Sequence, residues 1–128
     1  MTLNDILKSS DTVYEKISRI LRECNIRPNL LGYSYIRETL IHVHLGLCDV
    51  HSVTRSMYPT VASHMNTTPE RVERAMRHAI SSAWNLSRYE KSDIMEELFK
   101  VSVRASGKPT NSEFIATLAD VIAERVKT

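Results

Sequence analysis

The sequence contains little glycine and little cysteine. Its 128 residues include only three glycines and two cysteines. So few glycines nearly exclude a glycine-rich loop of the kind that holds the phosphates of a nucleotide. Cys24 and Cys48 cannot build the multiple-disulfide framework of a small secreted domain, so we expect a reducing, cytoplasmic setting.

Long apolar segments and a secretory signal are also missing. No apolar run approaches the roughly 18 residues needed to cross a bilayer, so we expect no membrane partner. The N-terminal stretch MTLNDILKSS lacks a basic region followed by an apolar one. The composition, with 42% hydrophobic and 25% charged residues, is that of a soluble globular domain. The net charge of +2 is too small to indicate a partner.

Motifs for catalysis are absent, and we therefore expect neither enzyme activity nor a cofactor. There is no GxSxG, no HExxH and no nucleophile with a base at a recognisable spacing. His44, Cys48 and His51 could share one face of a helix, and imidazole with thiolate suits zinc. The second pair of ligands typical of structural zinc is missing. We favour a buried cysteine with surface or capping histidines and assign no metal site.

The dominant hydrophobic period is helical, which predicts an all-α fold: a compact bundle of about six helices. Residues 1–10 are expected to be an N-terminal tail or linker remnant, and residues 11–128 a single domain. Pro59 is compatible with the first turn of its helix or with a break into two pieces. The expected helices span residues 13–24, 33–47, 51–65, 68–84, 93–99 and 111–126.

The stretch TPERVERAMRHAI predicts a strongly amphipathic helix. Thr68 can cap its N-terminus, with Pro69 at the favoured first position. At about 100° per residue, its apolar side chains fall within one arc of about 140°. An ordinary solvated helix with Glu–Arg pairs four residues apart is the simplest interpretation. The apolar arc consists of Val72, Ala75, Met76, Ala79, Ile80 and Ala83.

The residues before this helix favour a more specific interpretation. Ala62 is small where two helices must cross closely, and Asn66 tolerates the left-handed backbone of a tight turn. Val72 then supplies the apolar residue that packs the second helix onto the first. This order of a small residue, a left-handed turn and an apolar anchor is typical of a helix-turn-helix.

In such a motif the N-terminal half of the second helix faces base edges in the major groove. Arg71, Glu73 and Arg74 occupy that half. Arginine binds guanine O6 and N7 with two hydrogen bonds, and glutamate accepts from cytosine N4. The three residues therefore predict readout of a G/C-containing sequence in double-stranded DNA. Arg77 and His78 lie one turn later, where contact with phosphate is expected.

Three stretches resemble one known family closely: LGYSYIRETL, NTTPERVERAMRHAI followed by Trp84, and KPTNSEFIATLAD. They are similar to the DNA-binding effector domain of stage zero sporulation protein A, the response regulator that commits endospore-forming Firmicutes to sporulation. The resemblance spans about residues 13–127. It implies a helical domain of about six helices with a helix-turn-helix that activates or represses transcription at a short G/C-containing box.

The resemblance also implies individual roles. It assigns base reading to Glu73 and Arg74, with Arg71 just before them. The resemblance implies that a further set of residues lies near the DNA backbone. This set consists of Thr67 in the turn, Arg77, His78, Lys108, Thr110, Asn111 and Ser112. The resemblance also implies tandem copies on DNA and a contact between residues 85–99 and the sigma subunit of RNA polymerase. The phosphorylated receiver domain that usually begins such proteins has no counterpart in this sequence, so we expect either an excised effector domain or a stand-alone relative without control by phosphorylation.

A different class of function is compatible with the same helices. A helix-turn-helix scaffold can serve as a protein-interaction module without specific DNA binding. Such a module would bind DNA weakly and without sequence preference, or would not bind it. Phosphate contacts make DNA affinity fall steeply with salt, so a salt titration distinguishes the two hypotheses.

Overall fold

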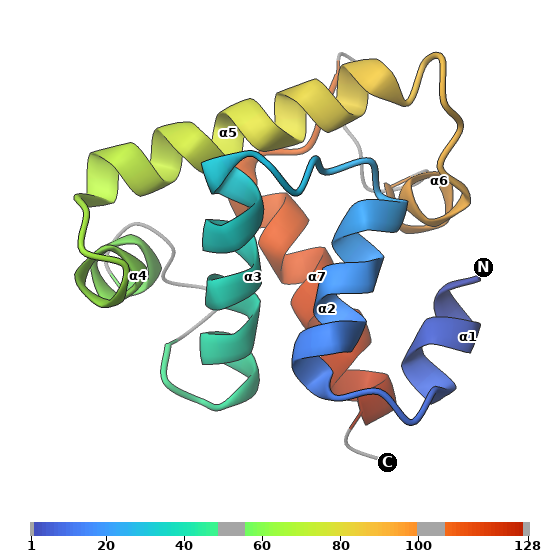
Figure 1. The fold of residues 1–128 in the computed structure, drawn as a ribbon, viewed down its shortest axis with the longest axis horizontal. Coiled ribbons are helices and arrows are strands. Elements are labelled where there is room, and N and C mark those ends of the chain that lie inside the picture. Colours follow the sequence, from blue (N-terminus) through green and yellow to red (C-terminus); the bar gives the residue numbers. More distant parts are fainter. Residues whose placement is uncertain (1, 49–55, 100–106, 127–128) are drawn as a thin grey trace.

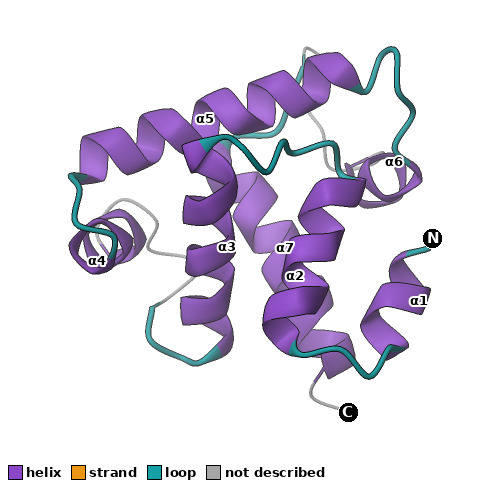
Figure 2. Cartoon of the chain, viewed as in Figure 1, coloured by secondary structure: helices purple, strands orange, loops and turns teal. Residues whose placement is uncertain are grey.

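The computed structural model describes residues 2–48, 56–99 and 107–126. Within these ranges the chain forms seven α-helices and no β-strand, which confirms the expected all-α fold (Figure 2). None of these helices is both long and apolar enough to cross a membrane. The helices are α1 (Leu3–Lys8), α2 (Val13–Glu23), α3 (Leu31–His44), α4 (Tyr58–His64), α5 (Pro69–Leu86), α6 (Asp93–Phe99) and α7 (Asn111–Val126).

The longest helix of the described residues, α5, lies across the beginning of α3 (Figure 1). Helix α4 lies below the N-terminal half of α5, and α6 lies near its C-terminal end. Helix α3 is the central element, since it contacts α2, α4, α5 and α7. The bundle therefore holds α5 from one side only, and the opposite side of α5 is left on the surface.

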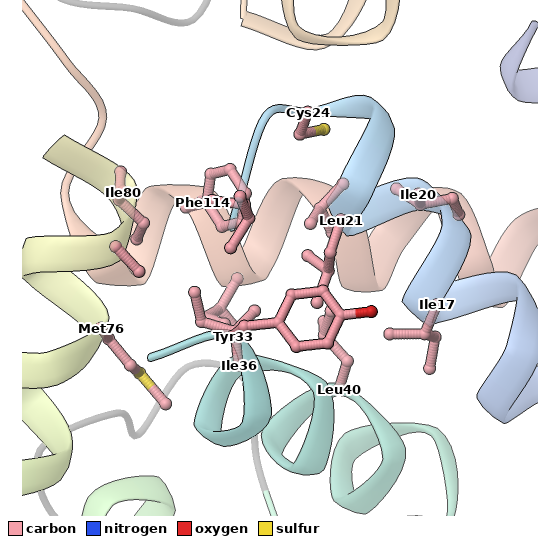
Figure 3. Packing of buried hydrophobic residues seen from close by; sticks show 14 of the residues in the cluster. Ile17, Ile20, Leu21, Cys24, Tyr33, Ile36, Leu40, Met76, Ile80 and Phe114 are labelled. Atoms are coloured by element: carbon pink, nitrogen blue, oxygen red, sulfur yellow. The ribbon is translucent and has the colours of Figure 1, made fainter. Parts of the chain in front are cut away.

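A single hydrophobic cluster joins the helices (Figure 3). Figure 3 shows the ring of Tyr33 among side chains of four helices. The Tyr33 hydroxyl donates a hydrogen bond to the backbone carbonyl oxygen of Ser18 at 3.1 Å, so this buried phenol has a polar partner. The other labelled side chains of the cluster are Ile17, Ile20, Leu21 and Cys24 of α2 and its C-cap, Ile36 and Leu40 of α3, Met76 and Ile80 of α5, and Phe114 of α7.

The first helix, α1, was not predicted from the sequence. It begins with a capping box, in which the Thr2 side chain accepts from the Asp5 backbone N–H and the Asp5 side chain accepts from the Thr2 backbone N–H. Its apolar residues Leu3, Ile6 and Leu7 are buried, and the helix contacts α2 and α7. Leu3, Ile6 and Leu7 thus belong to the packed core, although they lie within the segment 1–10 that we expected to be a tail or linker remnant.

Helices α2, α3 and α4 all end in the same way, with a left-handed residue after the last turn. The φ angles are 66° at Asn25, 75° at Gly46 and 59° at Asn66. In α3 the Leu47 N–H donates to the His42 carbonyl oxygen and the Gly46 N–H to the Val43 carbonyl oxygen, at 2.8 and 3.0 Å. This pair of hydrogen bonds is a Schellman motif, which satisfies carbonyl groups that the helix itself leaves unpaired.

This ending of α3 corrects two expectations. The helix ends at His44, three residues before the predicted end, because the chain turns at Gly46. Cys48 therefore does not share a helical face with His44, and His51 lies outside the described residues. The zinc site that His44, Cys48 and His51 could have formed on one helical face therefore lacks the shared helix that it requires. Burial raises the pKa of the Cys24 thiol to about 12.

Candidate nucleic-acid interface

Helices α4 and α5 form the predicted helix-turn-helix. The Thr67 N–H donates to the Ala62 carbonyl oxygen at 2.9 Å, and the Asn66 N–H donates to that of Ser63 at 3.5 Å. Asn66 has the positive φ that we expected from its place in the sequence. Asparagine tolerates this conformation better than most residues, and so it can replace the glycine common at such turns.

The packing between the two helices also follows the prediction. Ala62 is 2% exposed and Val72 is fully buried, so the small residue and the apolar anchor both lie in the core. Pro59 lies in the first turn of α4, which is one of the two expected alternatives, and residues 51–55 of the expected helix lie outside the described residues. A proline is tolerated there because the first backbone N–H groups of a helix have no partner within the helix.

The start of α5 is fixed by local chemistry. The Thr68 side chain accepts a hydrogen bond from the Arg71 backbone N–H at 3.3 Å, and Pro69 occupies the first turn. Both features were predicted. Because Thr68 is the N-cap, Arg71 lies in the first helical turn of α5. This is the end of α5 that follows the loop of the helix-turn-helix.

Gly32 sets how closely α3 approaches α5. A Cβ atom at this position would lie 2.2 Å from the carbonyl oxygen of Ala75 and 2.6 Å from the Cβ of Ala79. No side chain fits at such distances, and one of the two contacts is with backbone. Glycine is therefore required where the beginning of α3 packs under the middle of α5.

The exposed side of α5 has two flanks, and the predicted DNA-contacting residues divide between them. On one flank, a surface hollow of about 450 Å³ lies between α5 and the start of α3. The side chains of Arg71, Arg74 and His78 are exposed there. The hollow is lined by Leu31, Tyr35, Thr67, Arg71, Arg74, Ala75 and His78.

On the other flank, a hollow of about 320 Å³ separates α5 from the segment that leads into α7. Two predicted residues of α5, Glu73 and Arg77, thus lie beside the KPTNS stretch, although about 35 residues separate the two segments in the sequence. The lining consists of Tyr58, Glu73, Arg77, Ile80, Lys108, Pro109, Thr110, Asn111 and Ser112.

Within this second group, Asn111 has an internal role. It is buried, and its Nδ2 donates to the Tyr58 hydroxyl at 2.9 Å and to the Glu73 carbonyl oxygen at 3.0 Å. These two bonds use both N–H groups of the amide. Asn111 thus joins α7 to α4 and α5, in contrast to the contact with the DNA backbone that we expected. Burial also raises the pKa of the Tyr58 phenol.

Thr110 lies at the N-terminus of α7. Its hydroxyl accepts from the Glu113 backbone N–H at 3.1 Å, and its own N–H donates to Glu113 Oε1 at 2.8 Å. This capping box holds the KPTNS stretch in place. Thr110 and Ser112 are exposed and Lys108 is half-buried.

The charges on α5 are only partly paired. Arg77 Nε lies 3.0 Å from Glu73 Oε1, so one of the two expected Glu–Arg pairs forms. Within the described part of the chain, Glu70 and Arg74 form no ion pair with each other. The positive charges of Arg71 and Arg74 are therefore available to an anionic ligand. In an ordinary solvated helix with Glu–Arg ion pairs, these charges would be neutralised.

Comparison with known protein families identifies the family of this chain. Residues 17–122 match the family described as the C-terminal domain of sporulation initiation factor Spo0A. The chain belongs to this family. The Spo0A C-terminal domain family is a family of DNA-binding regulators of sporulation and is not a known enzyme family. The match covers α3, α4, α5 and α6 completely, and so it includes the helix-turn-helix.

A further hollow follows the helix-turn-helix in this Spo0A-type domain. Its volume is about 610 Å³, and it lies between the end of α5 and α6. The loop before α6 is tied to the end of α2, because Asn25 Nδ2 donates to the Glu90 carbonyl oxygen at 2.7 Å. Helix α6 spans the predicted residues. The hollow is lined by Trp84, Ser87, Arg88, Ser92, Met95, Glu96 and Phe99.

Proposed function

We propose that this domain is a sequence-specific transcription regulator that reads a short G/C-containing box through α5. Membership of the Spo0A C-terminal family gives DNA binding and sporulation as the general function. The observation that carries the specific proposal is the exposure of Arg71 and Arg74, without ion pairs between α5 residues to neutralise them, at the beginning of the second helix of a helix-turn-helix. In this motif that part of the helix faces the bases.

The proposed roles follow from chemistry and place on the helix. Arg71 and Arg74 donate to guanine, and Glu73 accepts from cytosine N4. The remaining polar groups on the two flanks bind phosphate oxygens and so fix the position of the domain on the duplex. This backbone set consists of Thr67, Arg77, His78, Lys108, Thr110 and Ser112. We leave out the Asn111 side chain, since its amide N–H groups are already bonded inside the domain.

We also propose two partners beyond DNA. A second copy of the domain would bind an adjacent box in tandem. The sigma subunit of RNA polymerase would contact the surface formed by residues 85–99. The hollow beside α6 supports this surface as a contact site, because it combines apolar and charged lining residues.

A titration of duplex DNA over a range of salt concentrations tests the proposed function. Binding through phosphate contacts gives a logarithm of affinity that falls steeply and linearly with the logarithm of salt. Sequence-specific binding also requires that one duplex be preferred over scrambled controls. No binding, or binding that does not respond to salt and sequence, would support the alternative of a protein-interaction module on the same scaffold.

A further inference from the structure

Three side chains that could bind a metal meet between α3 and α4. His64 Nε2 lies 3.0 Å from Glu38 Oε1, and His42 Nδ1 lies 3.7 Å from the same oxygen. The two imidazole rings meet edge to face, with centroids 5.1 Å apart. One potential ligand atom from each of the three residues lies within 4.8 Å of the others.

The hydrogen bonding of His42 fits the role of a ligand. Its Nδ1 lies 2.7 Å from the backbone carbonyl oxygen of Glu38. A carbonyl oxygen only accepts, so this hydrogen bond needs the proton on Nδ1 and leaves Nε2 as the ring nitrogen that could bind an ion. Metal-binding histidines are commonly oriented in this way, with one nitrogen donating to a carbonyl group and the other left for the ion.

The exposure of the three side chains suits an ion that enters from solvent. The His42 side chain is 9% exposed and that of Glu38 is 21% exposed, so these two are held in place by the bundle. The His64 side chain is 58% exposed and has room to adjust. Zinc–ligand bonds of about 2.0–2.1 Å in a tetrahedron put the ligand atoms about 3.3 Å apart. The potential ligand atoms of the three residues lie within 4.8 Å of one another, so the side chains must move closer together to bind one ion.

We propose that Glu38, His42 and His64 form a binding site for a divalent transition-metal ion, with zinc as the best fit. Two imidazoles and one carboxylate are ligands that zinc accepts, and a water molecule would complete four-coordination. Magnesium and calcium prefer sites made of oxygen atoms alone. The site is separate from the exposed face of α5 that the proposed function uses.

The ion would join two elements that the chain brings together only on folding. Glu38 and His42 belong to α3, whereas His64 is the last residue of α4, immediately before the turn of the helix-turn-helix. An ion that binds the folded protein and not the unfolded chain stabilises the folded state. Bound zinc would therefore raise the melting temperature and hold α4 against α3.

Isothermal titration of the metal-free full chain with zinc chloride near neutral pH tests this site, together with melting temperatures in zinc and in EDTA. We expect one zinc ion per chain and a higher melting temperature in zinc. His64→Gln should lower the zinc affinity at least about tenfold and remove the rise in melting temperature. Comparing each variant with itself in EDTA removes any loss of stability caused by the substitution alone.

His44→Gln is the matched control, since it removes a histidine that lies on α3 with Glu38 and His42 but outside the cluster. This variant should bind zinc as the wild type does. Absence of zinc binding by the wild type would overturn the proposal, as would unchanged affinity in His64→Gln. Loss of binding in His44→Gln would also overturn it, because the ion would then belong to a different group of ligands. Magnesium binding as tight as zinc binding would contradict the nitrogen ligands.

Discussion

Arg77 holds both carboxylate oxygens of Glu73. Its Nε lies 3.0 Å from Oε1, and Nη2 lies 3.3 Å from Oε2. Both side chains are partly exposed, at 56% and 38%, so the pair adds little to the stability of the fold. Its consequence is electrostatic. The fork of the guanidinium offsets the negative charge of Glu73 on a helix that we propose to lie among phosphates.

Arg77→Ala should therefore weaken binding to every duplex by a similar factor. The substitution removes one phosphate contact and leaves the Glu73 carboxylate without its partner. The slope of log affinity against log salt should become less steep by about one. Fluorescence anisotropy titrations of specific and scrambled duplexes at several salt concentrations measure both effects.

Adding Glu73→Gln to Arg77→Ala separates the two contributions. If the unpaired carboxylate repels DNA, the double variant should recover part of the lost affinity without recovering base preference. A double variant that binds as weakly as Arg77→Ala would show that the pairing has no electrostatic role. A loss of preference at one base position in Arg77→Ala alone would make Arg77 a base-reading residue.

Arg74→Ala should weaken binding to the preferred box by about 1–3 kcal/mol and flatten the base preference at one position. The reason is the loss of two hydrogen bonds to one guanine. His78→Ala should instead weaken all sequences alike, since we assign it to the backbone. Lys8→Ala, which removes an exposed positive charge on α1, is the control for net charge. Unchanged affinity and preference in Arg74→Ala would show that the proposed docking is wrong.

Gly32→Ala should destabilise the domain by about 1–3 kcal/mol or more, because the new methyl group overlaps with α5. The contact with the Ala75 carbonyl oxygen is relieved only if α3 and α5 move apart. Urea unfolding measures the loss, with Ser34→Ala on the same helix as the control, whose effect should stay within about 0.5 kcal/mol. Equal stability of Gly32→Ala and the wild type would contradict the close approach of the helices.

Asn111→Ala should lower the free energy of unfolding by about 1–3 kcal/mol, since it removes the amide that donates to the Tyr58 hydroxyl in the core and to the Glu73 carbonyl oxygen. The salt dependence of DNA binding should not change at a temperature where the variant is folded. Asn111→Asp should not rescue stability, because a carboxylate cannot donate to a carbonyl group. A stable variant with a less steep salt dependence would instead make Asn111 a phosphate contact.

Much of the helix-turn-helix could be predicted because its signals are local. Thr68, Pro69 and Asn66 each act within a few residues of the chain, through a cap, a fixed φ and a tolerated left-handed conformation. Gly46 is a similar local signal, because glycine favours the left-handed conformation that ends α3. We nevertheless expected the helix to continue to residue 47 because Leu47 fits its apolar pattern. When a single turn residue sets the end of a helix, the predicted end can differ from the observed one by a few residues.

What the sequence did not reveal depends on contacts between distant segments. Helix α1 has a local capping box, but with six residues it is too short to be stable alone, and its stability comes from packing Leu3, Ile6 and Leu7 on α2 and α7. The buried bonds of Asn111 and the meeting of Glu38 with His64 likewise join residues far apart in the chain. Only the tertiary structure brings these groups together.

A binding selection from random duplexes tests the central claim most directly. The wild-type domain and the Arg74→Ala variant would be selected in parallel at moderate salt, and the enriched sequences compared. The proposed function predicts that the wild type enriches a short G/C-containing box and that the variant enriches the same box with one position no longer specified. No enrichment by the wild type, or the same fully specified box from both proteins, would contradict it.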